Sequence, residues 1–304
     1  MDIRDVYNRF IEKIQPEQIL KNEQMKKHTS FKIGGPADIM VLPKSKEEVQ
    51  FAINVCKVCN IDYYVIGNGS NLLVRDKGIR GVVIKLADNF NDVNIKGNRV
   101  IAQAGILLSA LSNRLMKESF KGFEFASGIP GTLGGAIAMN AGAYGGEMKD
   151  VLVGAYVVDE NGKIIYLDKK DMALDYRSSI IQKKGYVVVE AEMEFEKGDL
   201  TEIKEKIKDF TKRRTTKQPL HLPSAGSTFK RPQGYFAGKL IEDAGLKGVR
   251  VGGAQVSDLH SGFVVNVDNA TADDVIHLMG LVQKVVKDQF GVVLESEVKI
   301  IGEI

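Results

Sequence analysis

The sequence predicts a mixed fold, of the α/β or α+β class, with about two domains. Three observations support this. The 304 residues exceed the ~150 of one typical domain. The N-terminal region has the spacing of a β-α-β unit, with an extended segment over 28–42, a helix over 46–59 and a strand over 63–66. A strand over 262–267 and a helix over 272–290 repeat the alternation further along the chain.

The remaining elements follow from local patterns. Val6, Phe10 and Ile14 share one face of a helix predicted over 3–14. The turn at 159–162 ends in Asn-Gly, which suits positive φ and predicts a hairpin over 153–167. Thr271 with Asp274 and Gly291 form start and stop signals for the helix over 272–290. The other predicted elements are strands over 81–86, 99–104, 186–195 and 292–301, and helices over 107–117, from Leu200 and over 235–244.

Composition and charge exclude several classes of protein. The net charge of +3 and the absence of tryptophan argue against a nucleic-acid partner. No apolar run reaches the roughly 18–20 residues that span a bilayer. The first residues lack a basic start before an apolar core, so we expect no signal peptide, no membrane insertion and a cytoplasmic location. Pro219 and Pro223 break the chain after a basic helix end, which marks the best domain boundary.

Two glycine-rich segments carry the main functional signal. Gly67-Asn68-Gly69-Ser70-Asn71 follows an apolar strand, and a second segment places seven glycines between Ser127 and Gly146. Glycine lets a ligand approach the backbone closely, and successive N–H groups can form a concave anion site. Together they suggest a bound diphosphate, with tight turns alone as the alternative. Neither a Walker A loop nor Gly-x-Gly-x-x-Gly is present.

Each of the other candidate residues also has a plain structural interpretation. Ser227 lies between Gly226 and the cations Lys230 and Arg231, which suits an acidified hydroxyl, an anion site or a surface turn. We interpret Arg177, in Tyr-Arg-Ser-Ser, as a surface arginine. The alternation of a strand puts Glu295, Glu297 and Lys299 on one face, which we interpret as exposed to solvent. Arg214 and Lys217 stabilise a helix C-terminus or clamp a phosphorylated substrate. Cys56 and Cys59 lack nearby partners for zinc, so we interpret them as helix thiols and expect no metal.

In combination, seven motifs in order resemble the UDP-N-acetylenolpyruvoylglucosamine reductases over about residues 28 to 301. They are Thr29-Ser30-Phe31-Lys32-Ile33-Gly34-Gly35, Gly67–Asn71, Gly128-Ile129-Pro130-Gly131, Asn140-Ala141-Gly142-Ala143-Tyr144-Gly145, Tyr176-Arg177-Ser178-Ser179, Gly226-Ser227-Thr228-Phe229-Lys230 and Leu294-Glu295-Ser296-Glu297-Val298.

The resemblance implies an α+β fold. An FAD-binding domain of the vanillyl-alcohol oxidase (PCMH) type would cover 1–200, in subdomains of about 1–88 and 89–200. An α/β substrate-binding domain would cover 201–291, and the strand within 292–304 would return to the first domain. The cofactor-binding residues it implies are Gly67, Asn68, Gly69, Ser70, Asn71, Gly128, Ile129, Gly131, Thr132, Gly134, Gly135, Asn140, Gly142 and Ala143.

The resemblance also implies the reaction. NADPH would supply hydride through FAD to the β-carbon of the enolpyruvyl group of a UDP-sugar, giving UDP-N-acetylmuramate for peptidoglycan. Ser227 would donate the proton to the α-carbon, Arg177 would stabilise developing charge, and Glu297 would support the enolate if protonated or bridged by water. Arg214, Lys217, Lys230 and Arg231 would bind the substrate, and alanine at Arg214 or Lys217 would then raise KM.

This chain departs from much of the family. It has Arg231 and Thr228 where many members have Asn and Phe, and its segment from Ile180 to Glu196 is short. It therefore resembles the shorter subfamily, which lacks a substrate-covering loop with its tyrosine. We expect a monomer. The alternatives are an FAD-dependent oxidase of the same fold, or a flavin- or nucleotide-binding module without catalysis.

Overall fold

The computed structural model describes residues 3–87 and 89–304, which form two compact units. The first comprises Met1–Leu20, Ile39–Asn68 and Gly81–Arg214, and the second comprises Lys21–Asp38, Gly69–Arg80 and Thr215–Ile304. Met1, Asp2 and Asp88, which fall within the predicted subdomains, lie outside the described residues. The division into 1–200 and 201–291 stays a prediction.

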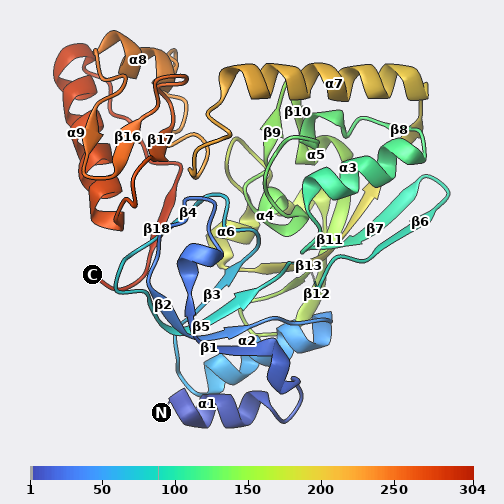
Figure 1. Cartoon of the computed structure of the whole chain (residues 1–304). Coiled ribbons are helices and arrows are strands. Elements are labelled where there is room, and N and C mark those ends of the chain that lie inside the picture. Colours follow the sequence, from blue (N-terminus) through green and yellow to red (C-terminus); the bar gives the residue numbers. More distant parts are fainter. Residues whose placement is uncertain (1–2, 88) are drawn as a thin grey trace. The chain divides into compact units, whose positions relative to one another are not determined.

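A four-stranded sheet and two helices form the N-terminal part of the fold (Figure 1). The strands lie in the order β1 (Ile19–Gln24), β2 (Pro36–Val41), β5 (Ile79–Lys85) and β3 (Tyr63–Ile66), with β3 parallel to β5. Helix α2 (Lys46–Val58) begins at the cap Ser45, whose hydroxyl accepts the N–H of Glu48, and it contacts α1 (Ile3–Phe10). Helix α1 ends one turn before the predicted Ile14, although Ile14 is buried as the apolar spacing requires.

A five-stranded antiparallel sheet forms the centre of the first unit. Its order is β12 (Ile164–Asp168), β11 (Leu152–Val158), β13 (Val187–Glu194), β7 (Arg99–Gln103) and β6 (Val93–Lys96). The predicted hairpin is confirmed, and Gly162 adopts φ 77° in its turn. The short helices of this unit are α3 (Leu108–Lys117), α4 (Leu133–Ala138), α5 (Met148–Val151) and α6 (Ile180–Lys184).

Small elements complete the first unit. Strand β9 (Gly142–Ala143) pairs with β10 (Gly146–Glu147), and β8 (Phe120–Lys121) pairs with β14 (Glu196–Lys197). Helix α7 (Leu200–Lys217) follows, as the apolar stripe from Leu200 predicts. The single-turn 3-10 helices of the described chain are η1 (Pro16–Gln18), η2 (Met25–Lys27), η3 (Glu124–Ala126) and η4 (Lys169–Met172).

The second unit has its own apolar core. Helix α9 (Ala272–Phe290) begins with the predicted capping box of Thr271 and Asp274 and ends at Gly291 with φ 69°. It buries Val275, Leu278 and Val282 in this core. This unit also contains α8 (Ala237–Asp243) and a sheet of β15 (Arg250–Val251), β16 (Ala254–Val256) and β17 (Val264–Asn266).

The last strand of the described chain returns to an N-terminal segment, as expected. Strand β18 (Lys299–Ile301) pairs in parallel with β4 (Leu72–Val74). The predicted strand over 292–301 was too long. Residues 292–298 make only one isolated bridge, Phe229 to Ser296, because β4 offers three residues of partner. Within the described residues, no helix has the length and apolarity to cross a lipid bilayer.

Candidate cofactor and active site

The two glycine segments meet in the first unit. Gly67 follows β3 directly, and a Cβ atom there would lie 2.1 Å from the Oγ1 atom of Thr132. The Nδ2 amide of Asn68 donates to the carbonyl of Pro130 at 2.9 Å. Only a residue without a side chain fits at position 67, so the backbones of both segments approach closely. The structure thus brings together two segments that the sequence predicted to share a cofactor.

Backbone hydrogen bonds fix the second segment at the start of α4. The N–H of Gly134 donates to the carbonyl of Ala104 at 2.8 Å, and the N–H of Leu108 donates to the carbonyl of Gly131 at 3.0 Å. A Cβ atom on Gly134 would lie 2.8 Å from the Cβ of Ala104. Close packing of α4 against the turn that follows β7 therefore requires this glycine.

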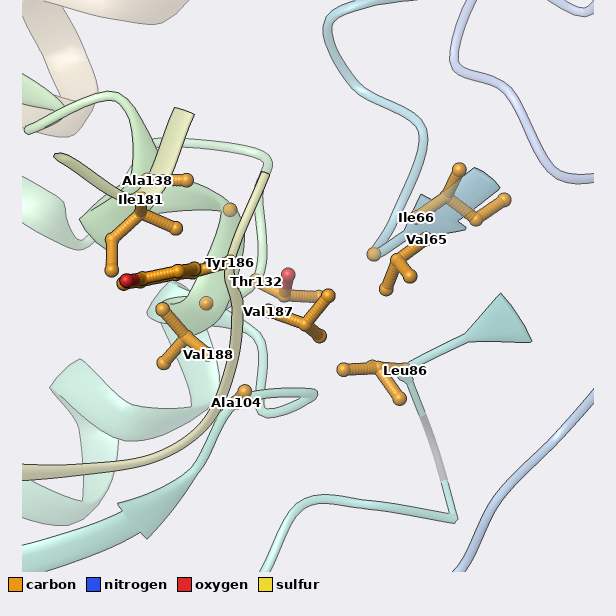
Figure 2. A pocket seen from close by; sticks show the side chains of 13 residues that line it. Val65, Ile66, Leu86, Ala104, Thr132, Ala138, Ile181, Tyr186, Val187 and Val188 are labelled. Atoms are coloured by element: carbon orange, nitrogen blue, oxygen red, sulfur yellow. The ribbon is translucent and has the colours of Figure 1, made fainter. Parts of the chain in front are cut away.

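A cavity of about 110 Å³ lies beside this junction. Figure 2 shows Val65, Ile66 and Leu86 on one side of it, Ala138, Ile181, Tyr186 and Val188 on the other, and Thr132 between them. Gly67, Gly134 and Gly135 also line it. Apolar walls with a few backbone polar groups are typical of small-molecule and cofactor sites. Sequence reasoning missed the apolar wall residues, because apolar strand residues carry no local signal of a ligand.

Gly69, Ser70 and Asn71 belong to the second unit. Gly69 has φ 61°, and a Cβ atom there would lie 2.1 Å from the carbonyl oxygen of His28. The Nδ2 amide of Asn71 donates to the carbonyl of Glu297 at 3.0 Å. The end of the first glycine segment is therefore attached to the backbone of a predicted catalytic residue.

Asn140 fixes the loop that follows α4. It is buried with φ 43°, and its Nδ2 donates to Glu147 Oε2 at 2.6 Å and to the carbonyl of Asp175 at 3.3 Å. Its Oδ1 accepts the N–H of Lys149 at 3.0 Å. Gly142 and Ala143 form β9 of the adjoining hairpin. The amide of Asn140 is thus engaged in shaping the predicted cofactor loop.

Arg177 occupies a tight turn in the first unit. Asp175 and Ser178 exchange backbone hydrogen bonds across it, and Arg177 adopts φ 52°, which is uncommon for a residue with a side chain. The turn is held in place because Asn140 bonds the Asp175 carbonyl and the buried Ser179 hydroxyl donates to the carbonyl of Ala138. Strained backbone that its surroundings enforce is often found at functional sites.

Ser227 and Glu297 lie on neighbouring segments of the second unit. The N–H of Glu297 donates to the carbonyl of Thr228, the residue after Ser227, at 2.9 Å. Ser227 is exposed, whereas Thr228 is buried and its Oγ1 accepts the N–H of Val264 at 2.9 Å. The buried neighbour therefore fixes the backbone from which the Ser227 hydroxyl projects.

A histidine supports the same loop. The N–H of Thr228 donates to the carbonyl of Gly262 at 2.8 Å, and the N–H of Gly262 donates to Nδ1 of His260 at 3.1 Å. Burial lowers the pKa of His260 below its usual value. A ring that accepts at Nδ1 is neutral, which agrees with that direction. No motif or spacing in the sequence pointed to this residue.

The predicted substrate cations differ in their surroundings. Lys217 is exposed at the end of α7. Lys230 pairs with Glu295 at 3.0 Å, and the Arg231 guanidinium lies 4.0 Å from the ring centre of Phe236. Arg214 instead donates through a terminal guanidinium nitrogen to the carbonyl of Gly128. Three of the four cations thus lie in the second unit, and Arg214 belongs to the first.

The cysteines show no sign of reactivity or metal binding. Both are buried, and burial together with the neighbouring Cys59 raises the pKa of Cys56 to about 12. A thiol protonated at neutral pH is a poor nucleophile and metal ligand. Within the described 3–87 and 89–304, no group of three or more His, Cys, Asp or Glu side chains is arranged for a metal ion.

Comparison with known proteins identifies the family. Residues 218–301 match the model of the UDP-N-acetylenolpyruvoylglucosamine reductase C-terminal domain, and residues 37–168 match an FAD binding domain. A UDP-N-acetylenolpyruvoylglucosamine reductase of Alkaliphilus oremlandii is 60% identical over 303 residues, covering 100% of both chains. The chain belongs to the UDP-N-acetylenolpyruvoylglucosamine reductase family. The resemblance inferred from the seven motifs is thereby confirmed.

Solved structures confirm the fold of the family. The UDP-N-acetylenolpyruvylglucosamine reductase of Thermus caldophilus superposes with a TM-score of 0.79 at 33% identity, covering 93% of this chain and 97% of that chain. Phl p 4, a grass pollen allergen with glucose dehydrogenase activity, gives a TM-score of 0.51 at 16% identity, covering 64% of this chain and 45% of that one. The second likeness concerns the fold alone. The predicted FAD-binding domain followed by a second domain is confirmed.

FAD fits the residues described above. The backbones of Gly67, Gly134 and Gly135 line the cavity, and successive N–H groups of a glycine-rich chain can bind a diphosphate. The family's FAD thus explains both glycine segments and the absence of a Rossmann or Walker sequence. Which individual atoms bind it stays a prediction.

Proposed function

We propose that the chain reduces UDP-N-acetylenolpyruvoylglucosamine to UDP-N-acetylmuramate with electrons from NADPH. Family membership supports the reaction. The observation that carries the residue assignment is the hydrogen bond from the N–H of Glu297 to the carbonyl of Thr228, which sets Glu297 beside the Ser227 loop. The two glycine segments would hold FAD, which would supply the hydride chemistry that links NADPH to the β-carbon of the enolpyruvyl group.

Addition of hydride to the β-carbon leaves an electron pair at the α-carbon, which then needs a proton. We assign this proton transfer to the hydroxyl of Ser227. A serine hydroxyl is a weak acid, so it needs donors or positive charge nearby. Exposure of Ser227 lets it recover a proton from water between turnovers, and Lys230 lies three residues away in sequence.

The developing charge spreads into the substrate carboxylate and must meet donors that are already in place. Arg177 supplies a cation from a turn that Asn140 and Ser179 hold rigid. Glu297 would support the enolate if it is protonated or bridged to it by water, since a bare carboxylate would repel it. Asn71 fixes the backbone at Glu297 from the first glycine segment.

The charged UDP end of the substrate requires cations. We assign this role to Lys217, Lys230 and Arg231. Lys217 and Arg231 are exposed, and Arg231 is preorganised because its guanidinium rests on Phe236 and its Nε donates to the carbonyl of Tyr235 at 3.3 Å. A planar guanidinium binds phosphate through two nitrogens. The cytoplasmic location and the monomeric state stay predictions.

The decisive experiment follows the flavin colour of the purified protein without oxygen. We expect NADPH to bleach the colour and UDP-N-acetylenolpyruvoylglucosamine to restore it. Recovery only when oxygen is admitted would favour an oxidase. Failure of the FAD-reconstituted protein to take up flavin would reject the proposal and leave a binding module of another kind.

A further inference from the structure

Helix α7 contacts the second glycine segment, Ser127 to Gly146, near both of its ends. The ring of Phe210 stacks on Tyr144 with centroids 4.5 Å apart and planes 9° from parallel. One turn further along α7, the guanidinium of Arg214 donates to the carbonyl of Gly128. Residues four apart share one face of a helix. One face of α7 therefore contacts both ends of the segment.

The contact at Gly128 depends on the missing side chain. A Cβ atom at that position would lie 3.1 Å from both Cδ and Nε of Arg214 and 3.5 Å from Cζ. The Nε atom of Arg214 is buried and has no hydrogen-bond partner among the described residues. A buried donor without a partner is costly. The guanidinium is thus packed directly against the backbone of Gly128.

From these contacts we infer that α7 braces the glycine segment, and that Arg214 and Phe210 are positioning residues for FAD rather than contacts of the UDP-sugar. This inference rests on the proposed function, because it requires the segment to hold FAD. Glycine-rich chain samples many conformations, and only a fraction of them can bind. If the contacts of α7 are lost, a smaller fraction of the molecules has the glycine segment in the binding conformation. The apparent dissociation constant of FAD then rises by the same factor by which that fraction falls.

The test is titration of the full-length apoprotein with FAD, followed by quenching of flavin fluorescence. We expect Arg214→Gln to weaken FAD binding by about tenfold or more, since it removes a hydrogen bond with a charged donor. Tyr144→Leu removes the ring stack and should weaken binding by about three- to tenfold.

Two matched controls accompany these variants. Arg213→Gln removes the neighbouring charge, which faces solvent and pairs with Asp209 at 2.8 Å. Tyr144→Phe keeps the stacking ring and removes only the hydroxyl. Both should bind FAD within about twofold of the parent protein, because neither removes a contact between α7 and the glycine segment.

A second readout separates positioning from substrate binding. With FAD saturating, the KM of Arg214→Gln for UDP-N-acetylenolpyruvoylglucosamine should match that of the parent protein. Unchanged FAD affinity with a raised KM would overturn the inference and make Arg214 a substrate ligand. If Arg214→Gln does not fold, Arg214→Lys and Tyr144→Leu decide instead, and parental FAD affinity in both would overturn it. If the parent apoprotein itself binds no FAD, the proposed function fails and this inference fails with it.

Discussion

The side-chain amide of Asn71 donates a hydrogen bond to the backbone carbonyl of Glu297 at 3.0 Å, across 226 residues of sequence. The N–H of Lys299 returns a bond to the carbonyl of Asn71 at 3.0 Å. The glycine segment that follows β3 and the segment that carries Glu297 are therefore fixed to each other. This relationship makes Asn71 a structural support for the proposed chemistry.

Substitution Asn71→Ala should lower kcat by about tenfold with FAD saturating. It removes one hydrogen bond worth about 0.5–1.5 kcal/mol and lets the backbone at Glu297 shift. Steady-state kinetics at high FAD measures the effect, and the thermal midpoint reports any general loss of stability. A parental kcat would show that Glu297 is held by other contacts alone.

Substitution Ser227→Ala should lower turnover by about 10²–10⁴-fold, as expected when a positioned proton donor is lost. Bleaching of the flavin by NADPH should continue at the parental rate, because that step involves no proton transfer to the substrate. Stopped-flow absorbance resolves both steps. If the substrate restores the flavin colour at the parental rate, another group or water supplies the proton.

Substitution Glu297→Gln tests the protonation state of Glu297. An amide keeps a hydrogen-bond donor and carries no charge, so we expect activity within about tenfold of the parent. Glu297→Ala should lose about 10²-fold or more. Comparison of kcat for the two variants decides, and equal, severe losses would mean that the carboxyl group acts in its ionised form.

Two helical glycines should respond in opposite directions to alanine. Gly134→Ala places a Cβ 2.8 Å from that of Ala104 and should destabilise the fold by about 1–3 kcal/mol. Gly280, within α9, has no atom within 4 Å of the added Cβ, so Gly280→Ala should stabilise by about 0.5–1 kcal/mol. Urea unfolding measures both, and a Gly134→Ala variant as stable as the parent protein or more stable would refute the packing argument at Ala104.

Stability should fall on acidification because of His260. Burial lowers the pKa of its ring in the folded state, so the unfolded chain binds more protons once the pH falls toward about 6.5. The contribution of His260 to the free energy of unfolding is complete above that pH and declines below it. Urea unfolding from pH 8 to pH 5 should show a smaller decline for His260→Asn, whose amide oxygen can still accept the Gly262 N–H. If the free energy of unfolding falls equally with pH in the parent protein and in His260→Asn, groups other than His260 cause the acid sensitivity.

Local signals predicted the elements that local chemistry determines. Helix α9 begins and ends where Thr271, Asp274 and Gly291 indicate, because capping groups act within one turn. Strand β18 is shorter than its sequence suggested, since a strand extends only as far as its partner, here Leu72–Val74. The sequence around Glu297 contains no information about the length of the partner strand β4.

The same distinction applies to the site. The glycine segments were recognisable because few other residues allow such close backbone approach. The partner of Arg214 was not, because a cation at a helix end suits a phosphate as well as a carbonyl, and Gly128 is distant in sequence. His260 supports the Ser227 loop through its ring Nδ1, which accepts the N–H of Gly262, and through the Gly262 carbonyl, which accepts the N–H of Thr228; such a chain of bonds leaves no pattern in the sequence.

The bond between Asn71 and Glu297 also has a consequence for synthesis on the ribosome. Every segment of the first unit precedes Thr215, whereas the second unit requires residues that follow it. Domains generally fold in the order in which they are made, and distant pairings close late. A growing chain can therefore form the cavity beside Gly67 and Thr132 before Ser227 and Glu297 have been translated. Flavin could then bind during translation, before the enzyme is able to protonate a substrate.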